Sequence, residues 1–95
     1  MNITGLQTFV SIVENGSLVR ASEQLNVTQS TVTARLRTLE QEVGATLLHR
    51  QKSGVTLTAS GTKLLGYAEI MIGLWHQARQ ETELWRQIGR FRYGH

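Results

Sequence analysis

Apolar residues recur at intervals of three and four along most of the chain, which contains no proline. This spacing is that of an amphipathic α-helix, so the pattern predicts a mainly helical protein. The first helix is expected to begin at an N-cap, Thr4, with Gln7 completing a capping box, and to stop at Gly16. Its apolar stripe consists of Leu6, Phe9, Val10 and Val13.

Two more helices are predicted next, each between a capping residue and a turn. Ser17 caps a short helix that ends at the turn 26–27, and Thr28 caps a third helix, 29 to about 43, that Gly44 ends. The narrow buried side of the short helix is formed by Leu18, Ala21, Ser22 and Leu25. The core-facing ridge of the third helix is formed by Val32, Leu36, Leu39 and Val43.

The segment 47–57 has a different pattern. It has fewer apolar positions, a turn signal at 53–54 and alternation after it, so it is expected to form a small hairpin, or wing. Thr58 then caps a fourth helix that continues to about residue 88, on the order of 45 Å long at 1.5 Å per residue. The predicted organisation is a domain at 1–58 with its helix-turn-helix near 18–37, a helix at 59–88 and a tail at 89–95.

The fourth helix carries a stripe with alternating spacings of four and three, the register of a heptad seam. The stripe consists of Leu64, Ala68, Met71, Trp75, Ala78, Thr82 and Trp85. Because Gly66 and Gly73 weaken the helix, it needs a partner surface. The length of the stripe favours pairing of two copies of the chain through Leu64, Ala68, Met71, Trp75, Ala78 and Trp85. The alternative is that the stripe packs on the chain's own core.

Composition restricts the possible functions. Ten basic and seven acidic residues give a net charge of +3, a weak indication of nucleic-acid binding that requires the fold to gather the cations on one face. Without cysteine there are no disulfides, thiolate metal sites or cysteine nucleophile. The N-terminus lacks the features of a signal peptide, and no apolar run is long enough to span a membrane. We expect a cytoplasmic protein without a membrane partner.

The third helix has a face of short polar side chains opposite its apolar ridge. Such a face fits the DNA major groove, about 12 Å wide, where the start of a recognition helix meets base edges. Base contacts are predicted for Gln29, Ser30, Thr33 and Ala34. Arg37, with Arg35 at the margin, would bind phosphates. The alternative is that residues 29–31 are ordinary first-turn residues after the cap.

Three residues outside the third helix are candidates for backbone contacts. Arg50 and Lys52 flank the wing, which could follow the adjacent DNA backbone, although two cations on a loop are usually only solvated. Thr58 leaves the first-turn N–H groups of the fourth helix available to a phosphate.

Together, residues 17–65 resemble the N-terminal domain of LysR-type transcriptional regulators. The resemblance is carried by Ser17, Ala21, Leu25, the run Thr28 to Thr33, Leu36, Leu39, Glu40, Val43, Gly44, Leu47, Arg50, Leu57, Thr58 and Gly61 to Leu65. It implies a mainly α winged helix-turn-helix of three helices and a two-stranded wing, followed by a dimerising linker helix. The predicted backbone contacts are Thr28, Thr31, Arg35, Arg37, Arg50, Lys52 and Thr58.

The sequence departs from the family pattern in places. Leu48 and His49 stand where such proteins usually carry phenylalanine before the arginine, Ser22 replaces a common alanine, and Lys52 stands near a usual arginine. The larger departure is length, because relatives carry a C-terminal α/β domain that binds a small-molecule effector. This chain is therefore either a fragment or a short stand-alone member, and no cofactor is expected within it.

An enzyme and a protein-interaction module are the alternatives to DNA binding. An enzyme is disfavoured because the three histidines lie far apart in sequence, Glu40 and Glu42 point in different directions, and no phosphate-binding glycine loop occurs. We expect neither a catalytic residue nor a metal site. The second alternative is a protein-interaction module that pairs through the long helix and modulates another regulator without reading DNA.

Overall fold

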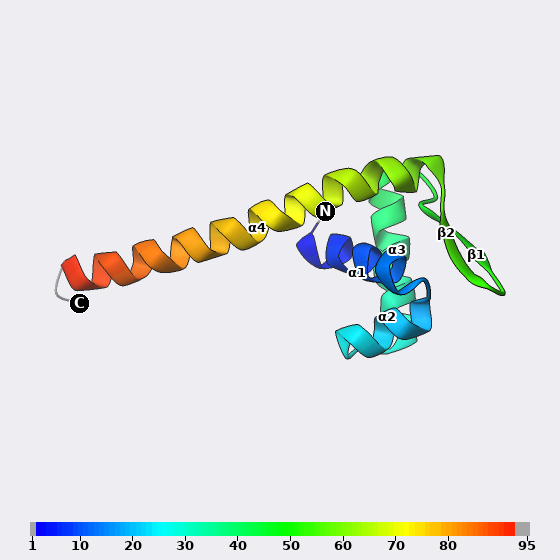
Figure 1. The fold of residues 1–95 in the computed structure, drawn as a ribbon, viewed down its shortest axis with the longest axis horizontal. Coiled ribbons are helices and arrows are strands. Elements are labelled where there is room, and N and C mark those ends of the chain that lie inside the picture. The colour runs from blue at the N-terminus through cyan, green and yellow to red at the C-terminus, as the bar shows by residue number, and fades with distance from the viewer. Residues whose placement is uncertain (1, 93–95) are drawn as a thin grey trace.

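A computed structural model describes residues 2–92 and shows a small helical head from which one long helix projects (Figure 1). The elements are α1 (Ile3–Asn15), α2 (Leu18–Leu25), α3 (Gln29–Val43), β1 (Leu48–Gln51), β2 (Gly54–Leu57) and α4 (Ala59–Arg92). The mainly α fold with three helices, a two-stranded wing and a long helix is thus confirmed.

Predicted residues begin or end each of the first three helices. Gly16 and Gly44 end α1 and α3 in the left-handed conformation, with φ of 70° and 80°, where glycine carries no steric penalty. The hydroxyls of Ser17 and Thr28 cap α2 and α3 by accepting hydrogen bonds from backbone N–H groups of the first turn. These local devices fix the relative directions of α2 and α3.

The start of α1 differs from the prediction. The side chain of Asn2 accepts a hydrogen bond from the N–H of Gly5 at 2.9 Å, so Asn2 is the N-cap and the helix begins at Ile3. The predicted cap at Thr4 with Gln7 is wrong. Asparagine caps a helix at least as well as threonine, and the earlier cap lets Ile3 join the helix and pack on the core.

The hydrophobic core lies where α1, α2, α3 and the start of α4 meet. Its buried residues are Leu6, Phe9, Ile12, Leu18, Ala21, Val32, Leu36, Leu39, Leu47, Leu48 and Ala68. The predicted ridge of α3 is confirmed at its first three positions but is wrong at Val43, which is 38% exposed because the helix ends there beyond the packed layer.

The wing is an antiparallel hairpin whose second strand is hydrogen-bonded to the head. β1 and β2 pair in the register Leu48↔Leu57 to Gln51↔Gly54. From β2, the N–H of Val55 donates to the carbonyl of Gly16, after the end of α1, at 3.3 Å. A Cβ at Gly54 would lie 2.7 Å from that carbonyl, so glycine is needed for this approach. The wing therefore has a fixed place beside the corner between α1 and α2.

The long helix α4 gives the molecule its extended shape, with principal extents of 59 × 26 × 20 Å. It runs to Arg92, four residues beyond the predicted end, and the rest of the predicted tail, 93–95, lies outside the described residues. Its first part packs on α1, and the remainder leaves the head (Figure 1). No helix among residues 2–92 combines the length and apolar character needed to cross a membrane.

Candidate nucleic-acid interface

The outer face of α3 is open to solvent. Val32, Leu36 and Leu39 are at most 1% exposed and anchor the opposite side of the helix in the core. The side chains of Gln29, Ser30, Ala34 and Arg37 are exposed, and Thr33 is half-buried. The N-terminal end of α3 lies beside α2, whereas α4 passes near its C-terminal end (Figure 1). A DNA groove could therefore reach the predicted base-contacting residues without moving another element.

Three hydroxyl groups gather at the N-terminus of α3. The Thr28 hydroxyl lies 3.1 Å from that of Ser30 and 2.9 Å from that of Thr31, and it also accepts from the N–H of Thr31. These bonds hold the hydroxyls at a helix end that carries partial positive charge. The cluster suits a phosphate oxygen, which accepts hydrogen bonds and is negatively charged.

Arg35 has a different environment from Arg37. Its guanidinium donates to the hydroxyl of Thr8 on α1 at 3.5 Å, and the side chain is half-buried. Arg37 is exposed, and no ion pair is described for it within residues 2–92. Of the two arginines, Arg37 is the one already free to reach a phosphate, whereas Arg35 would have to leave Thr8.

The wing carries two exposed cations. Arg50 lies on β1 and Lys52 lies in the turn before β2; both are exposed, and no acidic partner is described for either in the part of the chain covered by the structure. Thr58, at the base of the wing, has a structural role. Its hydroxyl donates to the carbonyl of Thr46 at 2.6 Å and accepts from the N–H of Gly61 at 2.9 Å. That hydroxyl is already engaged, so a phosphate here would meet only backbone N–H groups.

The predicted dimer stripe divides into two parts. Ala68 is fully buried in the chain's own core, with Leu64 and Met71 packed around it. The interface prediction is therefore wrong for Ala68, and the alternative of intramolecular packing holds for this first part. A heptad spacing cannot distinguish a partner helix of the same chain from one of another chain. Further along, Ala78 is exposed, and Trp75 and Trp85 are 43% and 67% exposed.

The structure also reveals apolar residues that sequence reasoning missed. They lie on the solvent side of α4: Tyr67, Ile70, Leu74, Leu84 and Ile88. Tyr67, Leu74 and Ile88 are separated by multiples of seven, and so are Ile70 and Leu84, so the five residues occupy two positions of a second heptad register. This pattern is visible in the sequence. Because soluble monomers rarely leave so many large apolar side chains exposed along one helix, this surface indicates a protein partner.

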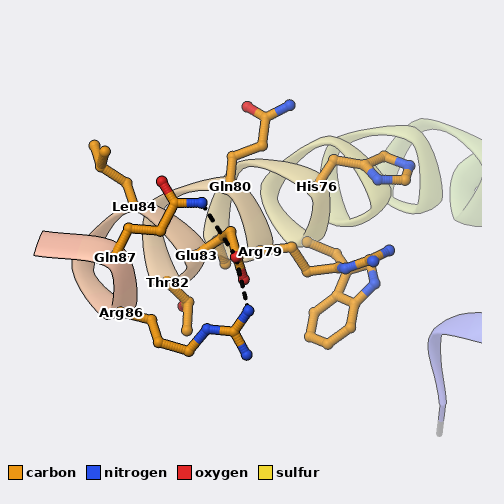
Figure 2. A pocket seen from close by; sticks show the side chains of 10 residues that line it. His76, Arg79, Gln80, Thr82, Glu83, Leu84, Arg86 and Gln87 are labelled. Carbon is orange, nitrogen blue, oxygen red and sulfur yellow. Dashed lines mark hydrogen bonds and ion pairs between the residues drawn. The ribbon is translucent and has the colours of Figure 1, made fainter. Parts of the chain in front are cut away.

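Polar residues flank the exposed half of α4. Figure 2 shows Arg86 and Gln87 turned toward Glu83, whose carboxylate accepts hydrogen bonds at 2.7 and 3.4 Å. The hydrogen bond from Arg86 lowers the pKa of Glu83 below its usual value. Because these groups are exposed, the pair adds little to stability. They line the same shallow pocket as Trp75.

The two histidines that the structure describes lie on different elements, one on β1 and one on α4. Among residues 2–92 no group of three or more histidine, aspartate or glutamate side chains could hold a metal ion. His49 lies exposed on the wing and His76 exposed on α4. The polar groups exposed on the outer face of α3 and on the wing are hydroxyls, an amide and cations.

Known proteins resemble this chain in sequence and in fold. Residues 3–62 match the family of bacterial regulatory helix-turn-helix proteins, lysR family. The HTH-type transcriptional regulator YofA of Bacillus subtilis is 40% identical over 82 residues, which are 86% of this chain and 29% of YofA. The CbnR DNA-binding domain, solved in complex with DNA, has a TM-score of 0.84 and 28% identity, covering 88% of this chain and 97% of that domain. DarR of Vibrio fischeri, also solved with DNA, has a TM-score of 0.89 and 26% identity, covering 93% of this chain and 30% of DarR. The chain spans less than a third of YofA and belongs to the lysR family of bacterial regulatory helix-turn-helix proteins.

Proposed function

We propose that this chain binds double-stranded DNA in a sequence-specific way and serves transcription regulation as a homodimer. The observation that carries this proposal is the open face of α3, whose polar side chains stand opposite a buried apolar ridge, in a head that also carries a wing with two exposed cations. Two proteins of the same fold, CbnR and DarR, were solved bound to DNA, which supports the proposal. The proposed setting is the cytoplasm, and no cofactor is proposed for this chain.

The proposed contacts divide by chemistry. Gln29, Ser30, Thr33 and Ala34 would meet base edges, because their short side chains project from the start of α3 into the groove. Phosphates would be bound by the hydroxyl cluster and by exposed cations. The proposed backbone contacts are Thr28, Thr31, Arg37, Arg50, Lys52 and the first-turn N–H groups that follow Thr58. Arg35 would join them only after leaving Thr8.

The proposed homodimer forms through the exposed part of α4. Trp75, Ala78 and Trp85 would pack against the second copy, together with the missed residues on the adjacent side. A twofold pair of heads matches an operator with two related half-sites, one major groove for each α3.

Binding to duplex DNA is expected to weaken steeply with salt. Arg37, Arg50 and Lys52 of two protomers make six cation–phosphate contacts, so log K should fall with log salt with a slope of roughly −5. The slope is measured by fluorescence anisotropy with a labelled duplex, at salt concentrations from about 50 mM to about 200 mM. Over this range phosphate-bound complexes lose much of their affinity. A flat dependence would favour the alternative, a protein-interaction module that does not touch DNA.

Substitutions on α3 are expected to separate base reading from backbone binding. Gln29→Ala or Thr33→Ala should cost about 1–3 kcal/mol on the preferred sequence and little on other sequences, because a base contact is lost. Arg37→Ala should weaken binding to all sequences alike, because phosphates are the same everywhere. Affinities for an operator selected from random DNA and for its single-base-pair variants provide the measurement. If all three variants changed their affinities for the operator and for its base-pair variants in the same way, this division of roles would be contradicted.

A further inference from the structure

The wing root, defined here as Thr46 and Leu47, is bound directly to the recognition helix. The N–H of Leu47 donates to the carboxylate of Glu40 on α3 at 2.7 Å. The carbonyl of Leu47 accepts from the N–H of Thr58 at 3.0 Å, and its side chain is fully buried. One residue thus connects the last turn of α3 with the start of α4.

Glu40 is in an unfavourable place for helix stability alone. A carboxylate in the last turn of a helix faces the negative end of the helix dipole. The backbone carbonyl of Glu40 is already satisfied by the N–H groups of Gly44 and Ala45, at 2.8 and 3.2 Å. Helix formation therefore does not explain the side chain, whereas the half-buried hydrogen bond to Leu47 does.

The other anchors of the wing lead to different elements. Val55 binds the carbonyl of Gly16 between α1 and α2, and Thr58 binds Thr46 from the start of α4. The bond from Glu40 is what relates the hairpin to the helix that would read bases. Without it, the four-residue connection 44–47 would be hydrogen-bonded to α3 only through the N–H groups of Gly44 and Ala45, and the wing root could shift relative to α3.

We infer that Glu40 is a positioning residue for DNA binding: its carboxylate holds the wing root so that Arg50 and Lys52 meet the DNA backbone while α3 lies in the groove. This inference rests on the proposed function. Glu40 itself touches no DNA in this scheme. A variant without the Glu40 carboxylate should therefore lose the phosphate contacts of the wing, whereas α3 should keep its preference for the same bases.

The test compares Glu40→Asp, Glu40→Ala and Glu40→Gln with the double variant Arg50→Ala/Lys52→Ala in the full chain. Aspartate keeps the charge but is one methylene too short to reach Leu47, whereas glutamine keeps the accepting oxygen and removes the charge. We expect the aspartate and alanine variants to bind DNA roughly tenfold more weakly. The slope of log K against log salt should become shallower by about as much as in the double variant, near 0.9 for each lost phosphate contact. The glutamine variant should keep the slope of the unaltered chain.

Two further readouts separate positioning from general damage. Amide hydrogen exchange at Leu47 should accelerate in the aspartate and alanine variants and stay slow in the glutamine variant, and the ranking of operator variants should not change. Adding Glu40→Asp to the double variant should lower the slope no further. The inference is overturned if Glu40→Asp keeps the full slope while the double variant loses it, or if Leu47 exchange is unchanged. If the double variant itself keeps the full slope, the proposed wing contacts fail instead.

Discussion

Replacing Trp75 and Trp85 together with glutamate is expected to give monomers that bind a two-half-site operator about 100-fold more weakly than the unaltered chain. Both indoles are substantially exposed: Trp75 borders a hollow that it lines with Ile3 and Leu6 of α1, and Trp85 lies further along α4. Neither belongs to the buried core, so the substitutions should not disturb it. They would place like charges in the proposed helix pair, where desolvated carboxylates are costly. Each head would then bind its half-site alone and lose the gain of joint binding.

Sedimentation velocity and anisotropy on the same samples measure both parts of this result. The matched control is Gln80→Glu, which adds a carboxylate to the same helix midway between the two tryptophans in sequence and about 140° around the helix from each. That variant should remain dimeric with unchanged affinity. Met71 is less suitable for such a test, because it packs on the chain's own core. A double tryptophan variant that sediments like the unaltered chain would refute the dimer through α4.

Gly61→Ala is expected to lower the free energy of unfolding by about 3 kcal/mol, within the range of severe backbone clashes. A Cβ at this position would lie 2.1 Å from the carbonyl oxygen of Leu47 and 3.0 Å from its carbon. Because the obstacle is backbone, relief requires α4 to move away from the wing root. Urea unfolding followed by circular dichroism measures the loss.

Gly66→Ala is the matched control in the same helix. No atom lies within 4 Å of a Cβ built there, so the variant should gain about 1 kcal/mol from the better helix propensity of alanine. Opposite signs for the two substitutions would show that close packing at the wing root, and not helix propensity, decides the effect. Equal and small effects would contradict the close approach of α4 to Leu47.

Features that depend on neighbouring residues could be predicted from the sequence. The caps at Ser17 and Thr28 and the stop at Gly44 were correct because each involves groups within a few residues of one another. The predicted N-cap of α1 is wrong although it too involves only neighbouring residues. Asn2 and Thr4 can both cap a helix, and the packing of Ile3 on the core decides between them.

Features that depend on tertiary packing could not be predicted. The sequence identified the apolar stripe of α4 but not the point where the head stops covering it, so Ala68 was assigned to the wrong partner. The side-chain partner of Arg35 lies 27 residues away, on α1. The bond between Glu40 and Leu47 crosses a turn and a change from helix to strand, and no spacing rule indicates it.

The continuous α4 has a consequence for how operators of different spacing could be recognised. If two heads are joined through this helix, the distance between them is fixed by its number of turns, while each head keeps its own DNA-reading face. Adding or removing seven residues in the projecting part would move the heads by about 10 Å and preserve the phase of the pairing face to about 20°. The spacing of the half-sites can thus change independently of the bases that are read.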